Sequence, residues 1–283
     1  MRVIVTGAAG QLGLVVVRRL QPTHDVIALT RAQLDVTRHD DVQRAVADAR
    51  PHAVINCAAY NAVDAAEDDV LPALESNAFA VRSLARAVSA AGATLVHYST
   101  DFVFDGDTET PYTERDPPAP KSVYGQTKLL GEWFAADAVR HYVIRVESLF
   151  GGPKPQSSVD RIIAALEAER TARVFTDRVV SPSYVDDVAV ATERLLAGTP
   201  PFGCYHCVNS GHVTWYELAL EIASILRCPP RFDATPAAAV QLRAPRPRFC
   251  ALSNAKLAAA GIPMPTWQDA LRRYLTQRDG RAA

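Results

Sequence analysis

The sequence RVIVTGAAGQLG at residues 2–13 reads as a short apolar strand, a glycine-rich turn and the start of a helix that continues to Leu20. In such a turn Gly7 permits the tight bend, Gly10 lets the backbone approach a pyrophosphate, and Gly13 lets the helix lie close to the sheet. The first N–H groups of the helix have no partners within it, so they can bind an anion. The stretch therefore predicts a nucleotide-binding strand-turn-helix unit, with Gly-x-x-Gly-x-x-Gly spacing in place of the commoner Gly-x-Gly-x-x-Gly.

Strands and helices alternate after this unit. Further short apolar segments that favour strands lie at residues 25–30, 53–59, 94–100 and 141–146, and a long helix is expected at 71–91. This alternation predicts parallel pairing with right-handed crossovers. We expect an α/β protein: a Rossmann-type doubly wound parallel sheet in residues 1–150, and a smaller C-terminal α/β substrate lobe in 151–283. Part of 177–200 is expected to return to the first domain.

Composition restricts the classes of function. The 283 residues carry a net charge of −1, which gives no electrostatic case for binding nucleic acid or acidic membranes. The apolar runs are of strand length, so no transmembrane segment is expected, and residue 1 leads directly into a strand without a signal peptide. Five scattered cysteines fit a reducing cytoplasm. Cys204-Tyr205-His206-Cys207 lacks the second ligand pair of a zinc site, so we interpret it as a strand and predict no metal site.

The second strand ends in Thr30-Arg31, where a site selective for NAD usually has an acidic residue. A guanidinium can pair with a 2′-phosphate, which favours NADPH and leaves NADH possible; the alternative is that Arg31 is a solvated loop residue. Asp35 is placed where an adenine amino group can bind. Asn77 lies within the long predicted helix, either on a plain polar face or as a buried amide that orders backbone or water near the site.

Two further stretches carry candidate chemistry. Ser99, Thr100 and Asp101 follow the fourth strand, and ligands of open α/β sheets bind at such ends. The sequence SVYGQTKLLGE at 122–132 places Tyr124 and Lys128 four residues apart, on one face of a helix. An ammonium beside a phenol lowers the pKa of the phenol, which then exchanges a proton with an oxygen that is becoming an alkoxide. The alternative is a surface helix that happens to begin with tyrosine.

Taken together, these stretches resemble the extended short-chain dehydrogenase/reductases, and within them the nucleotide-sugar 4-ketoreductases of the dTDP-4-dehydrorhamnose reductase type. The glycine turn, LDVT at 34–37, NCAAYNAVD at 56–64, STDFVFDG at 99–106 and the Tyr-x-x-x-Lys pair carry the resemblance. RPR at 246–248 and ALS at 251–253 add to it, so that it covers nearly the whole chain.

The resemblance implies an NAD(P)H-dependent reduction of the C4 ketone of a nucleotide-linked 6-deoxy sugar. It implies that Tyr124 donates the proton, that Lys128 holds the nicotinamide ribose, and that Thr100 hydrogen-bonds the substrate oxygen. The cofactor residues are then Gly7, Gly10, Gln11, Leu12, Gly13, Arg31, Asp35, Val36, Ala58, Ala59, Tyr60, Asn77, Tyr124 and Lys128. The substrate residues are Thr100, Asp101, Phe102, Glu147, Ser148 and Arg246, and the chain is expected to be a monomer or homodimer.

The chain departs from the family pattern at two positions. Val15 stands where relatives often carry the acidic residue of a metal-bridged dimer. Ser148 stands three residues after Arg145, where many relatives have a tryptophan that packs over the sugar. We therefore expect an altered sugar pocket, with Glu147 accepting hydrogen bonds from sugar hydroxyls, unless Phe150 or Trp215 fills the same volume.

The second half contains a Pro- and Arg-rich stretch at 229–247, which is either a solvated loop or a source of cations for a diphosphate. Asp186 and Asp187 are interpreted as a helix start whose carboxylates complement the helix dipole. Two other functions stay open for the whole chain: a nucleotide-sugar 4-epimerase, or a regulatory NADP-binding subunit of the same fold.

Overall fold

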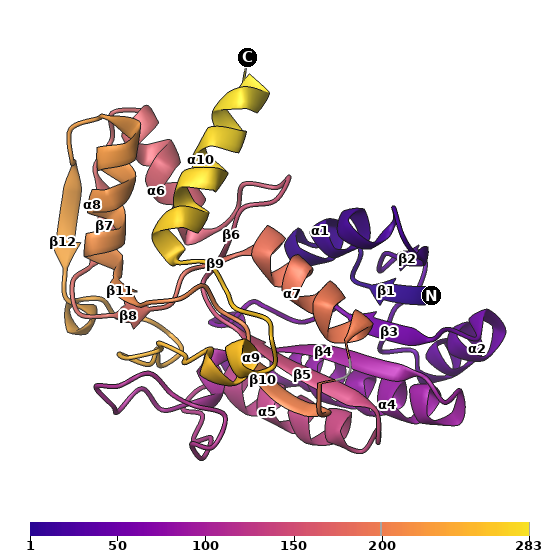
Figure 1. Cartoon of the computed structure of the whole chain (residues 1–283). Helices are drawn as coiled ribbons and strands as arrows, with labels where there is room; N and C mark the ends of the chain where they lie inside the picture. The colour runs from indigo at the N-terminus through magenta and orange to yellow at the C-terminus, as the bar shows by residue number, and fades with distance from the viewer. Residues whose placement is uncertain (199, 283) are drawn as a thin grey trace.

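A computed structural model describes residues 1–198 and 200–282. Its centre is a six-stranded, wholly parallel sheet in the order β10-β5-β4-β3-β1-β2 (Figure 1). The strands are β1 (Arg2–Thr6), β2 (Asp25–Leu29), β3 (Ala53–Asn56), β4 (Thr94–Thr100), β5 (His141–Val146) and β10 (Gly203–His206). Strand order reverses between β1 and β3, which in doubly wound sheets is where the ligand crevice opens. The predicted Rossmann-type sheet is confirmed.

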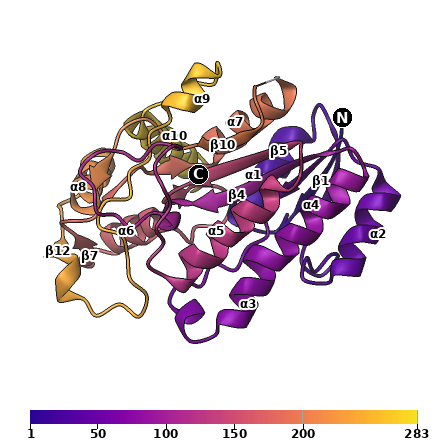
Figure 2. The ribbon, with the colours of Figure 1, turned by 90° about the horizontal axis from the view of Figure 1, so that it is seen from below.

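Helices cover both faces of this sheet. Helices α2 (His39–Ala49), α4 (Ala80–Ala90) and α5 (Val123–Ala136) lie side by side on one face (Figure 2), and α1 (Gln11–Leu20) and α7 (Val185–Ala197) pack together on the other. Side chains of β1 alternate between the two layers: Val3 and Val5 belong to the core that contains α1 and α7, and Ile4 belongs to the core under α2 and α4.

The helix predicted at 71–91 is divided. It consists of α3 (Val70–Leu74), a π-helical turn at Glu75–Phe79 and α4. Gly131 of α5 packs against this turn so closely that a Cβ there would lie 2.1 Å from the carbonyl oxygen of Asn77. Gly131 therefore fixes the position of this irregular turn, and the Asn77 side chain within the turn is fully buried.

A smaller group of elements lies beyond the carboxyl ends of the sheet strands (Figure 1). It contains α6 (Ser158–Glu167), α8 (Trp215–Leu226), α10 (Trp267–Ala282) and a strand pair formed by β7 (Ala172–Phe175) and β12 (Phe232–Thr235). Helix α9 (Ala255–Ala259) instead lies beside β10 of the central sheet. Short pairs join β8 (Val179–Val180) to β11 (Val213–Thr214) and β6 (Leu149–Phe150) to β9 (Ser183–Tyr184). One buried core is continuous from α1 and α7 into α6, α8 and α10, so the two groups pack against each other directly.

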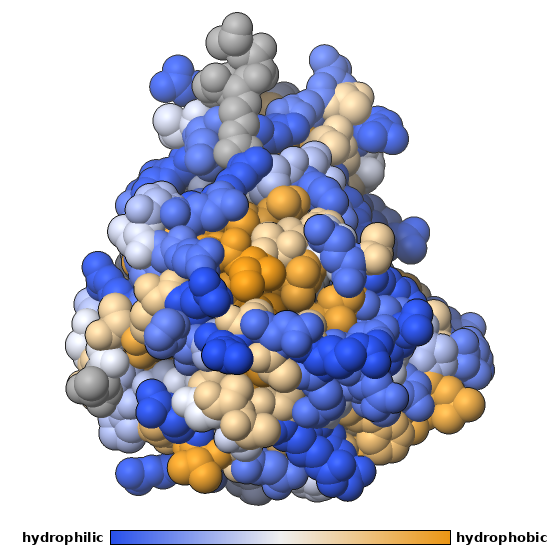
Figure 3. Space-filling view, turned by 90° about the vertical axis from the view of Figure 1, so that its right-hand side faces the viewer, coloured by the Kyte–Doolittle hydropathy of each residue, from blue (hydrophilic) through white to orange (hydrophobic). Residues whose placement is uncertain are grey.

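The strands of the sheet begin on the side of the molecule where the N-terminus lies (Figure 1), and Figure 3 looks onto this side. Polar side chains cover most of this face, around a central apolar area. Among the described residues, no helix has both the length and the apolar character needed to cross a membrane.

Candidate active site

The glycine turn lies between β1 and α1 and is tightly packed. Gly7 has a φ of +64°, and a Cβ there would lie 2.6 Å from the backbone nitrogen of Ala58. A Cβ on Gly13 would lie 2.3 Å from the carbonyl oxygen of Gly7. Both positions require glycine because any side chain would collide with backbone rather than with a movable group.

The N-terminus of α1 fits a phosphate group. Gly10 is its N-cap, no side chain caps the helix, and no acidic residue occupies its first turn. The first N–H groups are therefore free to donate to an anion, as the pyrophosphate of a dinucleotide requires. Gln11 Nε2 donates a hydrogen bond to the carbonyl oxygen of Gly151 at 3.0 Å, and Lys154 Nζ donates one to that of Ala9 at 2.7 Å. These two contacts tie the glycine turn to the start of the second half of the chain.

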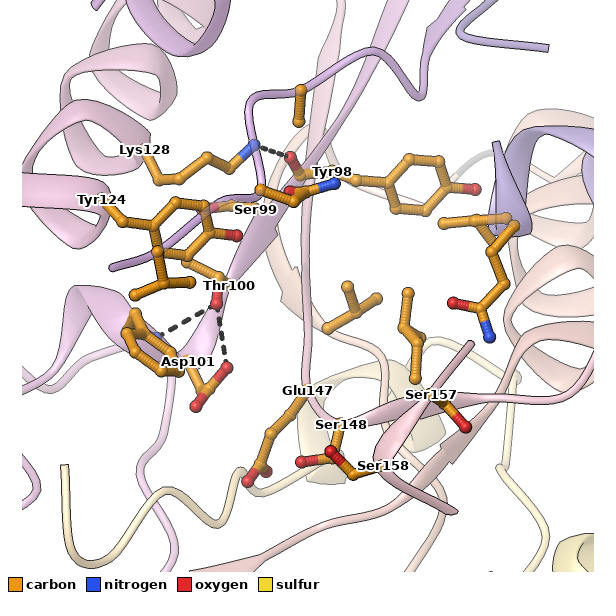
Figure 4. A pocket seen from close by; sticks show the side chains of 18 of the residues that line it. Tyr98, Ser99, Thr100, Asp101, Tyr124, Lys128, Glu147, Ser148, Ser157 and Ser158 are labelled. Carbon is orange, nitrogen blue, oxygen red and sulfur yellow. Dashed lines mark hydrogen bonds between the residues drawn. The ribbon is translucent and has the colours of Figure 1, made fainter. Parts of the chain in front are cut away.

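Thr100, at the end of β4, lines a cavity that is also lined by residues 10–13 of the glycine turn and of α1 (Figure 4). Its hydroxyl donates to Oδ1 of Asp101 at 2.9 Å and accepts the N–H of Phe102 at 3.2 Å. Thr100 thereby caps the short 3₁₀ turn Asp101–Val103 that follows the strand.

Helix α5 approaches this turn closely because of a glycine. A Cβ on Gly125 would lie 2.2 Å from the carbonyl oxygen of Phe102. The hydroxyl of Ser122 caps the helix by accepting the N–H of Gly125 at 3.1 Å. This docking places the Tyr124 ring edge-on to Phe102, with ring centroids 5.6 Å apart, and brings the phenol to the cavity beside Thr100 (Figure 4).

The pKa of the Tyr124 phenol is raised in the structure, whereas the sequence analysis expected it to be lowered. Burial raises the pKa of Tyr124, the charge of Asp101 raises it further, and the Thr100 hydroxyl lowers it. Lys128 Nζ donates to the carbonyl oxygen of Tyr98 at 2.6 Å, and burial lowers the pKa of Lys128 to about 8. The prediction of a lowered pKa for Tyr124 is wrong for this structure, because burial and the charge of Asp101 outweigh the hydrogen bond that lowers it. A phenol with a raised pKa keeps its proton at neutral pH and can donate it.

Tyr124, Lys128, Thr100 and the glycine turn line one cavity of about 690 Å³. The predicted residues that line it are Gly10, Gln11, Leu12, Gly13, Ala59, Thr100, Asp101, Phe102, Tyr124, Lys128, Glu147, Ser148 and Arg246. This volume lies within the range of about 300–1,000 Å³ that is typical of ligand pockets. One continuous space therefore connects the anion-binding turn to the candidate catalytic groups.

The remaining predicted cofactor residues do not line this cavity. Arg31 is exposed and pairs with Asp35 at 3.5 Å. Hydrogen bonds from Thr37 lower the pKa of Asp35, and the charge of Arg31 adds to the effect. Val36 is buried in the core under α2. This arrangement leaves the Arg31 guanidinium open to a second anion on its solvent side.

The segment from Ala58 to Tyr60 lies next to Gly7 of the glycine turn and is hydrogen-bonded to the Asn77 side chain. The Ala58 N–H donates to the side chain of Asn56 at 3.2 Å. The Asn77 amide is fully buried, accepts the N–H of Tyr60 at 2.9 Å and donates to the Tyr60 carbonyl oxygen at 3.1 Å. Of the two alternatives for Asn77, the structure supports the buried amide that orders backbone.

Glu147 and Ser148 follow β5. Oε2 of Glu147 accepts the N–H of Ser181 at 2.8 Å, Oε1 has no hydrogen-bond partner among the residues that the structure describes, and the residue is only 2% exposed. Ser148 has a φ of +44°, in the left-handed region that bulky side chains rarely adopt. Any residue with a Cβ, the serine included, bears about 1–2 kcal/mol of backbone strain in this region.

Of the two aromatic residues considered as substitutes for a tryptophan at 148, only Trp215 lies at the cavity. Phe150 is fully buried and packs against Tyr184 and Tyr274. Trp215, at the start of α8, lines both the main cavity and a neighbouring one of about 340 Å³.

The sequence analysis missed two arginines that line both cavities. These are Arg161 on α6 and Arg178 before β8. Of the arginines predicted at 229–247, Arg246 lines the main cavity and pairs with Asp64, whereas Arg231 pairs with exposed Glu169 away from it. No local motif marks Arg161 or Arg178; the charge pattern of α6 alone is that of an ordinary amphipathic helix.

A parallel sheet with a glycine turn at its switch point, and a Thr, Tyr and Lys around the adjoining cavity, define a short-chain dehydrogenase/reductase. The family model of the RmlD substrate binding domain matches residues 1–279, and this chain belongs to that family. The resemblance noted from the sequence is confirmed.

Individual relatives agree with this assignment. The chain is 38% identical to a dTDP-4-dehydrorhamnose reductase of Streptomyces griseus, over 99% of this chain and 95% of that protein. It is 41% identical to a probable dTDP-4,6-dihydroxy-2-methyloxan-3-one 4-ketoreductase of Streptomyces antibioticus, over 96% and 94%. The crystal structure of dTDP-4-dehydrorhamnose reductase from Bacillus anthracis in complex with NADP superposes with a TM-score of 0.93, at 34% identity, covering 98% of this chain and 99% of that one.

Proposed function

We propose that this protein is an NADPH-dependent reductase of the dTDP-4-dehydrorhamnose reductase type, acting on the C4 ketone of a nucleotide-linked 4-keto-6-deoxyhexose. One observation supports it above the others: a single cavity joins the free N-terminus of α1 to the Thr100, Tyr124 and Lys128 side chains. The cofactor supplies a hydride when bound. Each remaining part of the reaction is assigned below to residues of this chain.

Tyr124 is the proton donor in this proposal. Its raised pKa keeps the phenol protonated at neutral pH, and it faces the cavity next to Thr100. A ketone oxygen that gains negative charge takes the phenol proton, while the Thr100 hydroxyl supplies a second hydrogen bond. Lys128 stays fixed by the Tyr98 carbonyl and presents its remaining N–H donors to a ribose hydroxyl.

The cofactor and the nucleotide of the substrate bind at opposite ends of the cavity. We assign the pyrophosphate of NADPH to the N-terminus of α1 and its 2′-phosphate to Arg31; NADH lacks that phosphate and binds more weakly. At the other end, Arg161 and Arg178 provide two cations for the diphosphate of the sugar nucleotide, and Trp215 offers a flat face for the base. Residues 151–283 then form the substrate lobe, apart from the segment that contains α7 and β10. In that segment α7 packs beside α1 on one face of the central sheet, and β10 is a strand of the sheet.

The surroundings of the enzyme are also part of the proposal. None of the five cysteines forms a disulfide, which supports a reducing compartment such as the cytoplasm. Val15 is buried against the core and offers no carboxylate for a metal bridge, so we propose a monomer or a homodimer that needs no metal.

The test is NADPH absorbance with dTDP-4-keto-6-deoxyglucose, with and without a 3,5-epimerase. We expect NADPH oxidation when the epimerase is present. Interconversion of sugars without net oxidation would instead indicate a 4-epimerase. Cofactor binding without either reaction would indicate the regulatory subunit. A parallel assay with the 2-deoxy analogue distinguishes the two kinds of substrate named for the Streptomyces relatives.

A further inference from the structure

An ion pair joins the two halves of the chain at the wall of the main cavity. Asp64 lies in the loop after β3, and Arg246 lies in the Pro- and Arg-rich stretch before α9. Nη2 of Arg246 donates to Oδ2 of Asp64 at 2.8 Å. Arg246 lines the cavity, and so does Val63, which precedes Asp64. The pair therefore connects a loop of the nucleotide-binding sheet to a segment of the second half where both segments border the same space.

The Asp64 carboxylate makes two contacts with this segment. Its Oδ1 accepts the N–H of Ala244 at 3.0 Å, while its Oδ2 accepts the hydrogen bond from Arg246. Nη1 of Arg246 also donates to the carbonyl oxygen of Ala244 at 3.3 Å. Ala244 is fully buried, and the Arg246 side chain is 15% exposed. One carboxylate thus holds both the backbone and the guanidinium of the segment, which restricts the direction of the Arg246 side chain.

This direction brings the guanidinium next to the candidate proton donor. The central carbon of the Arg246 guanidinium lies over the Phe102 ring, 5.7 Å from its centroid, and that ring packs edge-on against Tyr124. A cation over an aromatic face is attracted by the ring. A guanidinium has five N–H donors, and Asp64 and Ala244 take two of them. The others can donate to an anion in the cavity.

A second cation lies close to Arg246. Burial lowers the pKa of Arg246 and the charge of Arg178 lowers it further, whereas Asp64 raises it. Two neighbouring guanidinium groups at one cavity wall favour a ligand with more than one negative charge, such as a diphosphate. Because the Asp64 side chain is 50% exposed, water screens its charge, and Arg246 can still attract such a ligand.

Another ion pair joins the same two segments but points elsewhere. Arg243 pairs with Asp68, both side chains are more than half exposed, and neither residue lines the main cavity. The Asp68 pair can hold the two segments together, but it directs no cation to a ligand. The chain therefore contains its own control for the role of Asp64.

We propose that Asp64 is a positioning residue, which holds Arg246 against Phe102 so that the guanidinium is already directed at the diphosphate of a sugar nucleotide. Without Asp64, the ligand has to order Arg246 and the segment around Ala244 when it binds, and this cost lowers its affinity. Proton transfer from Tyr124 does not involve Asp64. The inference rests on the proposed function, from which the diphosphate is taken.

The test compares the wild type, Asp64→Asn and Asp68→Asn by calorimetric titration with dTDP and by steady-state kinetics. Each variant removes one carboxylate charge between the same two segments, and asparagine at 64 keeps an oxygen for the Ala244 N–H. For Asp64→Asn we expect the Kd of dTDP and the KM of the sugar nucleotide to rise about 10-fold, the lower end for a charge-assisted hydrogen bond because the pair is partly exposed. Its kcat should be unchanged, because only uniform binding is lost. Asp68→Asn should change none of these values, since exposed pairs contribute little.

Three results would overturn the proposal. The first is an Asp64→Asn variant with a lower Tm but an unchanged Kd for dTDP, which would indicate a merely structural role. The second is an equal loss of affinity in both variants, which would mean that the ion pairs only tether the segments. The third concerns an Arg246→Gln background, where Asp64→Asn should cause no further loss; an additive loss would show that Asp64 does not act through Arg246.

The same measurements separate this proposal from the proposed function. If dTDP binds but no sugar nucleotide is reduced, the proposed function fails, and the calorimetry still decides the role of Asp64. If the wild type does not bind dTDP, the positioning role is overturned as well. Thermal melts of each variant show whether it folds.

Discussion

Replacing Glu132 by glutamine should destabilise the protein substantially. Glu132 on α5 and Arg145 on β5 form a bidentate ion pair, with Nη2–Oε2 at 2.7 Å and Nε–Oε1 at 2.9 Å. Their side chains are 7% and 6% exposed, and the guanidinium lies 4.9 Å from the centroid of the Phe104 ring. The pair fixes the helix that carries Tyr124 and Lys128 to the central sheet.

The size of the effect follows from the burial. A neutral glutamine leaves the Arg145 charge without its counter-charge, which costs about 3–5 kcal/mol when the partner is buried. Unfolding entropy is about 2.1 cal/mol/K per residue, which gives about 0.6 kcal/mol/K for a chain of this length. The expected decrease in Tm for Glu132→Gln is therefore about 5–8 °C.

Differential scanning calorimetry at pH 7.5 measures this decrease. The matched control is Arg31→Ala, which removes an ion pair whose arginine is 88% exposed and should change Tm by less than about 1 °C. A double variant, Glu132→Leu with Arg145→Met, should recover most of the lost stability because no charge stays buried. A Tm decrease no larger than that of the control, or a double variant less stable than Glu132→Gln, would refute the reasoning.

Two further predictions concern the chemistry. Tyr124→Phe should keep NADPH affinity and fold but lose about 10²–10⁴-fold in kcat, because the proton donor is removed; near wild-type turnover would exclude Tyr124 from that role. Arg31→Ala should weaken NADPH by about 10- to 100-fold and NADH much less, because only NADPH has a phosphate for the guanidinium, as fluorescence titration of both cofactors would show. An equal loss for both cofactors would mean that Arg31 does not bind the 2′-phosphate.

The part of the fold that the sequence predicted depends on local signals. Gly7 and Gly13 can be read in advance because a strand and a helix flank them directly, and their tight backbone contacts are consequences of that one turn. The end of β4 is equally local, since the apolar run stops at Ser99 and Thr100. These local signals are sufficient to predict the cavity residues of the glycine turn and of the end of β4, because neither depends on long-range packing.

The rest of the cavity depends on contacts between segments far apart in the chain. Arg178 and Arg161 meet at the cavity only because α6 and the segment before β8 fold over the carboxyl ends of the sheet. The hydrogen bond from Lys128 to the Tyr98 carbonyl depends on how α5 docks on β4, and the pKa of Tyr124 depends on burial and on Asp101, neither of which the Tyr-x-x-x-Lys spacing reveals. The proximity of Asp101 to Glu147 requires the register of β4 and β5, which neither strand specifies alone.

The altered sugar pocket stays a prediction, and the structure indicates which residues would account for it. Ser148 has a left-handed backbone conformation that disfavours a large flat side chain, and the Glu147 carboxylate is bonded to the Ser181 N–H. The segment after β5 therefore offers no aromatic surface to a sugar ring. The aromatic residue that lines the cavity from the second lobe is Trp215, whose backbone N–H donates to the Arg178 carbonyl oxygen at 3.2 Å. We therefore expect recognition to depend mainly on the nucleotide end of the substrate.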